Sequence, residues 1–204
     1  MRGSWRRPNG GRCLTTLPND YVIVDTETTG LSFDSCDIIE IGAAKVADGE
    51  VVERFSELIH VDDPLPPFIT GLTGITDRML TTAKTKGEVV RSFSEFAADS
   101  TLMAHNANFD MTFLYLAYED VLGIPLANDF VDTLGVARRA LPELGHHRAK
   151  DVCAALGVTN EHAHRALADA IAEHECYQIM RRKLIDRYGV EGHSYPYVRS
   201  KRIS

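Results

Sequence analysis

Two acidic side chains, Asp25 and Glu27, stand one residue apart where the apolar run 21–24 ends, and residues 28–30 form a turn after them. Side chains alternate faces along a strand, so these two carboxylates are expected to project together, within several Å of each other. Like charges this close need a cation, or one of them stays protonated. A metal site and a simple strand-to-turn junction both fit this pair taken alone.

Three further side chains could join the pair, although they lie far along the chain: Asp110, His164 and Asp169. Asp110 opens the apolar-rich stretch 111–122, which is long enough for a helix. An acidic residue in the first turn also suits the helix dipole, so an ordinary helix start remains an alternative role for Asp110.

His164 and Asp169 flank the start of a helix that is predicted from about residue 166 to beyond residue 180. Five residues of regular helix turn the direction of a side chain by about 140°, so the two cannot point the same way if both are helical. His164 is therefore expected on a loop that bends it inward, where it can exchange protons. A solvated histidine remains the alternative, and it applies equally to His162.

Strand-like runs at residues 21–26, 38–46 and 51–59 must position the first two carboxylates. Asp48-Gly49 joins the last two runs and is a strong hairpin signal, so an antiparallel meander is expected. Residues 64–76 are rich in proline, glycine and threonine, which predicts a loop with a short helical turn.

The rest of the chain alternates helical and strand-like patterns. Helical spacing of apolar residues predicts a helix around residues 89–97, and residues 101–105 are expected as a short strand. Further helices are expected at 111–122, 131–140 and 149–156, and the last helix should bury a stripe made of Ala168, Ile171, Ala172, Cys176 and Ile179. This order predicts an α/β fold with a mixed sheet, antiparallel at its start, and helices on both faces.

The composition limits the range of functions. A chain of 204 residues with 44% hydrophobic and 25% charged residues is typical of one soluble domain, and its net charge of −7 argues against holding duplex nucleic acid by bulk electrostatics. The four cysteines lack C-x-x-C spacing, so reduced thiols are expected rather than a zinc framework. Neither a membrane span nor a signal-peptide core is found, which predicts a cytoplasmic protein.

Three motifs together resemble a known family. They are Asp25-Thr-Glu27-Thr-Thr-Gly30-Leu31, His105-Asn-Ala-Asn-Phe109-Asp110 and His164-Arg-Ala-Leu-Ala-Asp169. In order and spacing they resemble the exonuclease motifs of the DEDD nucleases in the histidine-bearing variant. The chain is most similar, over residues 21–187, to the proofreading 3′-to-5′ exonucleases of bacterial DNA polymerase III, of the epsilon or PolC type. One departure is Ala149, which follows Arg148 where the family usually carries leucine.

The resemblance implies a ribonuclease H-like fold and a metal-dependent mechanism. Asp25, Glu27, Asp110 and Asp169 would hold two divalent cations, Mg²⁺ or Mn²⁺, which prefer such hard oxygen ligands. His164 would accept a proton from the attacking water, a task that suits a side chain with a usual pKa of about 6.5.

The resemblance also implies a substrate and partners. Leu31 and Phe109 would pack against the terminal nucleotide, and Thr28, Gly30 and Asn106 would shape its pocket. The partners would be the single-stranded 3′ end of DNA or RNA and a DNA polymerase catalytic subunit, with no membrane involved. A basic cluster could line the path of the strand, although charged runs are often only solvated surface: Arg138, Arg139, His146, His147, Arg148 and Lys150.

The expected organisation is a flexible basic tail at residues 1–19, an exonuclease domain at 20–188 and a C-terminal tail at 189–204. Three alternatives remain open from the sequence. The chain could be an RNA-trimming exoribonuclease of the same family. It could be a phosphatase of the haloacid dehalogenase type, whose D-x-D-x-T motif resembles the start of Asp25-Thr-Glu27. It could also be a nuclease-like module that binds nucleic acid without cutting it.

Overall fold

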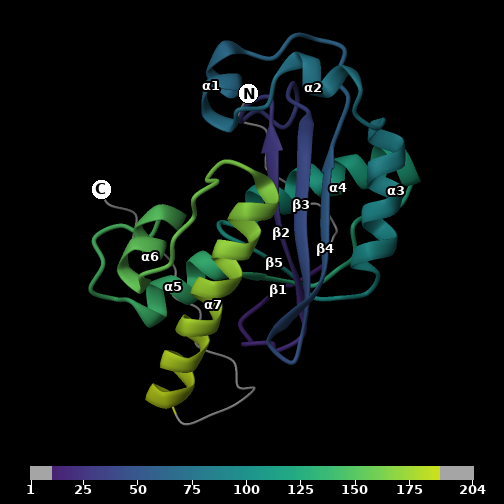
Figure 1. Ribbon diagram of the computed structural model, residues 1–204. Helices are drawn as coiled ribbons and strands as arrows, with labels where there is room; N and C mark the ends of the chain where they lie inside the picture. Colours follow the sequence, from purple (N-terminus) through teal and green to yellow (C-terminus); the bar gives the residue numbers. More distant parts are fainter. Residues whose placement is uncertain (1–10, 189–204) are drawn as a thin grey trace, which may run out of the picture.

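The computed structural model describes residues 11–188, which form one six-stranded sheet in the order β1-β6-β5-β2-β3-β4 (Figure 1). Its strands are β1 (Cys13–Leu14), β2 (Tyr21–Thr28), β3 (Ile38–Ala47), β4 (Glu50–Leu58), β5 (Leu102–Ala104) and β6 (Phe130–Asp132). Strands β2, β3 and β4 pair antiparallel, whereas β1, β6, β5 and β2 run parallel to one another. The sheet is therefore mixed and antiparallel at its long strands, as predicted.

The β3–β4 hairpin follows from its turn residues. Asp48 and Gly49 both have positive φ angles, 51° and 79°, which is the backbone of the two-residue turn that favours such pairs. This turn fixes the register of β3 against β4, in which Ala47 lies opposite Glu50. In the neighbouring β2–β3 pair, Asp25 lies opposite Gly42 and Glu27 lies opposite Glu40.

Seven helices accompany the sheet within the described residues: α1 (Pro67–Thr73), α2 (Asp77–Thr81), α3 (Lys86–Ala97), α4 (Asn108–Leu122), α5 (Thr133–Ala140), α6 (Ala149–Leu156) and α7 (Ala166–Tyr188). Their ends follow familiar signals. Thr85 caps α3 in a reciprocal arrangement with Glu88, and α4 ends at Gly123 in the left-handed region.

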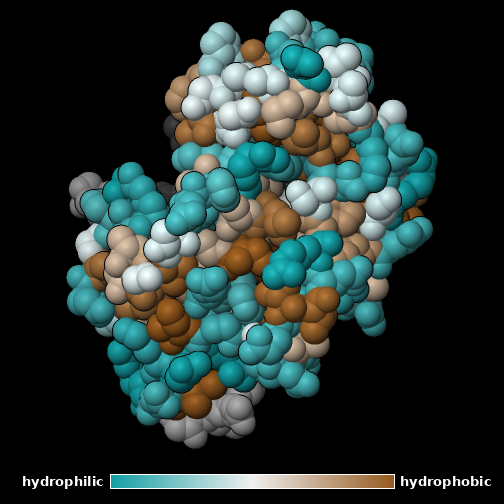
Figure 2. All heavy atoms as spheres, in the orientation of Figure 1, coloured by the Kyte–Doolittle hydropathy of each residue, from teal (hydrophilic) through white to brown (hydrophobic). Residues whose placement is uncertain are grey.

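The helices cover both faces of the sheet, which confirms the predicted layers (Figure 1). Alternate β2 residues supply the two cores: Val22 and Val24 pack with α3 and α4, whereas Tyr21 and Ile23 pack with α5 and α7. Figure 2 shows mainly hydrophilic side chains over this view of the molecule, with apolar ones gathered near its middle. Within residues 11–188, every helix is too short or too polar to cross a membrane.

Residues 64–76 contain more helix than the expected loop with a short turn. Helix α1 occupies most of the segment, and α2 follows immediately after it. Both helices close a small separate core, because Ile69 and Leu80 are buried together with Ile39 and Ile75. The proline and glycine residues that predicted a loop instead mark helix ends, since α1 begins at a proline and ends at Gly74.

The predicted tail boundary at residue 19 differs from the structure. Residues 1–10 and 189–204 lie outside the described residues, but Cys13–Leu14 already forms β1, paired parallel to β6. Leu17 is buried, and the Tyr177 hydroxyl donates a hydrogen bond to the Pro18 carbonyl oxygen. Segment 11–19 therefore belongs to the folded domain, held mainly through its backbone.

Two helix predictions need correction. The segment 131–140 is not a single helix, because Phe130–Asp132 forms β6 and the helix starts only at Thr133. The predicted buried stripe of α7 is correct at Ala172 and Cys176 but wrong at Ala168, Ile171 and Ile179, which are only partly buried. The buried face instead includes Ala166, Ala170, Glu173, Tyr177, Met180 and Leu184.

Candidate active site

The first two carboxylates lie at the C-terminal end of β2. Ile23 belongs to the core beneath α7 and Val24 to the core beneath α4, so strand alternation directs Asp25 and Glu27 toward the α7 face. Thr26 points to the opposite face, toward α4. The end of β2 therefore presents side chains to α7 on one face of the sheet and to α4 on the other.

Asp110 comes to this strand end from the first turn of α4 and is only 4% exposed. Its Oδ1 atom accepts hydrogen bonds from the Thr26 hydroxyl at 2.7 Å and from the Thr26 main-chain nitrogen at 3.1 Å. The residue between the two β2 carboxylates thus holds the third carboxylate in place. These bonds use one oxygen of Asp110.

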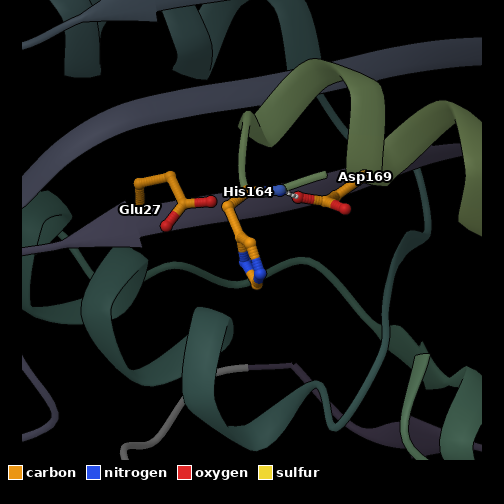
Figure 3. Close-up of side chains that lie close together, drawn as sticks. All are labelled: Glu27, His164 and Asp169. Atoms are coloured by element: carbon orange, nitrogen blue, oxygen red, sulfur yellow. Dashed lines mark hydrogen bonds between the residues drawn. The ribbon is translucent and has the colours of Figure 1, made fainter. Parts of the chain in front are cut away.

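Asp169 and His164 approach from the start of α7 (Figure 3). His164 lies before the helix with a φ of 66°, and its main-chain nitrogen donates to Asp169 Oδ2 at 2.7 Å. Asn160 donates to Asp169 Oδ1 at 2.6 Å. The loop therefore bends back on the helix, as the spacing of His164 and Asp169 predicted, and it leaves the imidazole exposed.

An ion pair anchors this loop to the sheet. Glu40 of β3 is almost fully buried and accepts hydrogen bonds from the Arg165 guanidinium, at 2.7 Å from Nη2, and from the Ala166 main-chain nitrogen at 3.0 Å. Because Glu40 lies opposite Glu27, this anchor places the start of α7 beside the first carboxylate pair.

The close approach of α7 also needs a glycine. A side chain at Gly42, opposite Asp25, would collide with the backbone of Ala166 and Leu167. Glycine is the residue that lets two backbones come this close. Gly42 thus permits the helix that carries Asp169 to rest directly on β3.

The burial and mutual repulsion of these carboxylates raise their pKa values. Burial raises the pKa of Asp25 well above its usual range, and four neighbouring charges raise it further: Asp110, Asp169, Glu27 and Glu173. Burial, followed by the charges of Asp169, Glu40 and Asp110, raises the pKa of Glu27 to about 8.

The other two carboxylates show the same direction. Burial raises the pKa of Asp110 to about 7, although the hydrogen bonds from Thr26 oppose the shift. Burial also raises the pKa of Asp169 against the hydrogen bond from the His164 nitrogen. The ionised carboxylates repel one another, and a bound cation would neutralise that repulsion.

The residues present fit a divalent metal ion. Ligand atoms of Glu27, His164 and Asp169 all lie within 4.8 Å of one another (Figure 3). Carboxylate oxygens dominate the cluster, and such hard ligands suit ions of the magnesium and manganese kind. The cluster can therefore hold a metal ion.

A cavity of about 720 Å³ opens at these residues. All four carboxylates and His164 line it, together with Asn106 and Phe109 of the predicted substrate-binding set. Arg148 and Lys150 from the predicted basic cluster line it as well. One cavity thus combines acidic, aromatic and basic groups.

Thr28, Gly30 and Leu31 are not among the residues that line this cavity. The Thr28 hydroxyl donates to the Gly30 carbonyl oxygen at 2.6 Å, so both residues shape the turn after β2. Leu31 follows this turn with 82% of its surface exposed. Leu31 is therefore an apolar side chain that is open to solvent and available for contact with another molecule.

Glu173 and His105 line the cavity as an interacting pair, and neither was among the predicted site residues. Glu173 lies on α7 one turn after Asp169, and its carboxylate is 3.4 Å from the His105 imidazole. His105 begins the second motif, so its place in that motif was a signal. Glu173 gave a weaker signal, because its position four residues after Asp169 marks the same helix face only once that face is known.

A mixed sheet flanked by helices, with four acids and a histidine lining one cavity at the end of β2, is an arrangement that suits a nuclease. Residues 22–177 match the family RNase_T, described as exonuclease. The chain belongs to this exonuclease family, which confirms the resemblance read from the three motifs and decides against a phosphatase of the haloacid dehalogenase type.

Similar proteins agree with this assignment. The chain is 39% identical over 173 residues to the PolC-type DNA polymerase III of Bacillus cereus and 42% identical over 153 residues to that of Bacillus subtilis. These matches cover 85% and 74% of this chain but only 12% and 11% of the polymerases. The chain thus corresponds to a small part of these relatives.

Solved structures share the fold. Exonuclease X in complex with 5′-overhanging duplex DNA matches with a TM-score of 0.63 and 24% identity, over 83% of this chain and 93% of that one. Escherichia coli exonuclease I in complex with a dT13 oligonucleotide matches with a TM-score of 0.72 and 16% identity, over 84% and 43% of the two chains. The predicted ribonuclease H-like architecture is thereby confirmed.

Proposed function

We propose that this protein is a metal-dependent 3′-to-5′ exonuclease that removes nucleotides from the 3′ ends of DNA. The observation that carries the proposal is the meeting of four carboxylates at one cavity: Asp25, Glu27, Asp110 and Asp169. They come from β2, α4 and α7, and their raised pKa values call for a cation. Paired cations held by carboxylates are the usual apparatus of phosphodiester hydrolysis.

The four carboxylates would hold two divalent cations, Mg²⁺ or Mn²⁺. When bound, a pair of such ions makes water more acidic and stabilises the charge that develops on the attacking and leaving oxygens. Thr26 fixes Asp110 through two hydrogen bonds, and Asn160 and the His164 nitrogen fix Asp169, so the ligands are oriented before any ion arrives.

His164 is the general base in this proposal. Its main-chain nitrogen is held by Asp169, but its imidazole is exposed at the cavity, where a ring nitrogen can accept a proton from water. A loop position lets the ring move between the cavity and solvent and so pass the proton on. General bases of this kind contribute about 10²- to 10⁴-fold in rate.

Phe109 and Leu31 would contact the terminal nucleotide, with Asn106, Thr28 and Gly30 shaping the pocket. Phe109 is supported from behind, because its ring packs 5.8 Å from Phe33 and 5.1 Å from Phe113. Contact through apolar faces tolerates any base, which an enzyme that trims unspecified 3′ ends requires. Arg148 and Lys150 would meet the phosphates further along the strand.

The relatives favour DNA as the substrate and a polymerase as the partner. The curated relatives are PolC-type DNA polymerases, and exonuclease I is bound to a single-stranded DNA oligonucleotide. A proofreading role with a polymerase catalytic subunit follows by analogy. The RNA-trimming exoribonuclease remains the second candidate, because the same carboxylate set would serve either sugar.

The test is digestion of matched single-stranded DNA and RNA oligonucleotides that carry a 5′ label, with Mg²⁺ or Mn²⁺. We expect a ladder that shortens from the 3′ end of DNA, release of mononucleotides, and no reaction with EDTA or with the Asp25→Asn variant. Internal cleavage, or no product from either polymer, would contradict the proposal. Faster digestion of RNA would select the exoribonuclease alternative.

A further inference from the structure

A fifth carboxylate, Glu173, faces the same cavity without belonging to the three motifs. It lies on α7 and is only 6% exposed. Its Oε2 atom is 3.4 Å from Nδ1 of His105, and its Oε1 atom accepts no hydrogen bond from the residues that the structure describes. A buried carboxylate costs several kcal/mol in lost solvation, whereas an apolar residue would fill the same space at no such cost.

The two ring nitrogens of His105 face different partners. Nε2 of His105 lies 2.8 Å from the carbonyl oxygen of His147, and a carbonyl can only accept, so Nε2 must carry a proton. Nδ1 lies 3.4 Å from Oε2 of Glu173 and has no hydrogen-bond partner among the residues that the structure describes. Glu173 is therefore the polar group that Nδ1 faces, and this contact orients the imidazole ring.

This chain of contacts ends at residues 146–150, which we call the basic segment. His147 also bonds through its own Nε2 to the carbonyl oxygen of Leu141, at 2.9 Å, which closes the loop between α5 and α6. The next residue, Arg148, lines the same cavity as the acids, as does Lys150, and the Arg148 guanidinium also pairs with Asp151. Glu173, His105 and the His147 carbonyl thus connect the helix that carries Asp169 to the basic residues that follow His147.

We propose that Glu173 is a positioning residue that acts through His105 to hold segment 146–150, so that Lys150 and Arg148 meet the phosphates of the bound strand. The inference rests on the proposed nuclease function and extends it to nucleotides beyond the one that is cleaved. Glu173 touches neither the reacting atoms nor the terminal nucleotide in this scheme. Its loss therefore weakens the hold on a strand while the chemistry continues.

Two substrates separate these effects. A single-stranded oligothymidylate of twelve nucleotides reaches the basic segment, whereas the p-nitrophenyl ester of thymidine 5′-monophosphate occupies only the cleavage site. For Glu173→Ala we expect KM for the oligonucleotide to rise on the order of 10-fold, the size typical of residues that orient others. We expect kcat to stay within about 2-fold and the nitrophenyl ester to be hydrolysed as by wild type.

The Glu173→Gln variant is the matched control. Its amide can donate to Nδ1 of His105 while Nε2 keeps its proton, so the connection survives without the charge. We expect wild-type KM values from this variant. Equal losses on both substrates in Glu173→Ala, or a Glu173→Gln variant as poor as Glu173→Ala, would overturn the positioning role.

The basic segment provides a second check. Lys150→Ala should raise the oligonucleotide KM in wild type but add little in the Glu173→Ala background. Without Glu173, Lys150 is no longer positioned to contact the phosphates, so its removal has little left to change. Full additivity would overturn the inference. Weaker Mn²⁺ binding by Glu173→Ala in isothermal titration calorimetry would also overturn it, since Glu173 would then act as a ligand.

Failure of the inference differs from failure of the proposed function. If wild type hydrolyses both substrates and Glu173→Ala affects them equally, only the role of Glu173 is wrong. If wild type with Mg²⁺ or Mn²⁺ hydrolyses neither substrate, the nuclease proposal itself fails, and the inference falls with it.

Discussion

Gly42 of β3 and Leu167 of α7 meet backbone to backbone, with no room for a side chain between them. Gly42 lies directly opposite Asp25, and Leu167 is two residues before Asp169. This close backbone contact and the ion pair between Glu40 and Arg165 together set how near Asp169 of α7 lies to Asp25 of β2. Close packing at Gly42 is therefore one condition for the four carboxylates to lie together.

Gly42→Ala should separate α7 from β3 and so weaken both the fold and the metal site. An added methyl group has backbone atoms in its way, and overpacking of this kind costs about 1–3 kcal/mol. Thermal unfolding and Mn²⁺ titration would measure the two losses. Gly71→Ala is the matched control, because a methyl group there meets no atom within 4 Å. A Gly42→Ala variant as stable as wild type would contradict the close packing.

Asp25→Asn should stabilise the metal-free protein while abolishing metal-dependent nuclease activity. The change removes a charge repelled by four other acids, and the described residues donate no hydrogen bond to this side chain. Relief at a functional site of this kind is worth about 1 kcal/mol, or about 2–4 °C in Tm for a chain of this size. Melting curves in EDTA would measure the gain, with exposed Asp99→Asn as the control. A lower Tm would show that Asp25 is not under repulsion.

The metal-free protein should lose stability as the pH rises from about 4 to about 8. The carboxylates have raised pKa values in the folded state. Below their unfolded pKa of about 4 they are protonated in both states, so they do not lower the free energy of unfolding. As the pH climbs toward the folded value of about 8 for Glu27, the folded state must give up protons that it holds more tightly than the unfolded state does. That difference lowers the free energy of unfolding.

Divalent ions should reverse this trend, because they favour the ionised carboxylates. We expect Mn²⁺ to raise Tm more at pH 8 than at pH 5, as measured by calorimetry in matched buffers with EDTA as the reference. Equal Tm shifts at the two pH values would argue against binding by this carboxylate cluster.

His164→Asn should remove the base while keeping the backbone of the loop. Asparagine adopts the positive φ of this position more readily than alanine does, and its amide cannot accept the proton. We expect kcat to fall on the order of 10²-fold or more with Mn²⁺ affinity unchanged. Exposed His162→Asn should behave as wild type. If Mn²⁺ affinity drops instead, His164 is a metal ligand, as its distance to Glu27 and Asp169 allows.

The strands of the meander could be predicted from the alternation of apolar residues and from one turn signal. The projection of Asp25 and Glu27 on the same face of a strand follows from the same alternation. Strand β6 could not, since three residues followed at once by a helix leave no period to detect. Strand β1 has two residues and pairs through its backbone, which composition does not reveal.

The buried face of α7 shows the limit of hydrophobic periodicity. Glu173 and His174 lie inside with the apolar residues, so a search for apolar spacing selected a neighbouring face. The convergence of Asp110 and Asp169 on β2 depends on contacts such as Thr26 with Asp110, and no local rule gives these. Only the resemblance to a family brought those residues together before the structure did.

Asp169 lies on the final helix of the described residues, so it is synthesised last of the four carboxylates. On the proposed assignment, a growing chain holds only three of the four metal ligands until α7 has been made. We therefore expect nuclease activity to require synthesis through that helix.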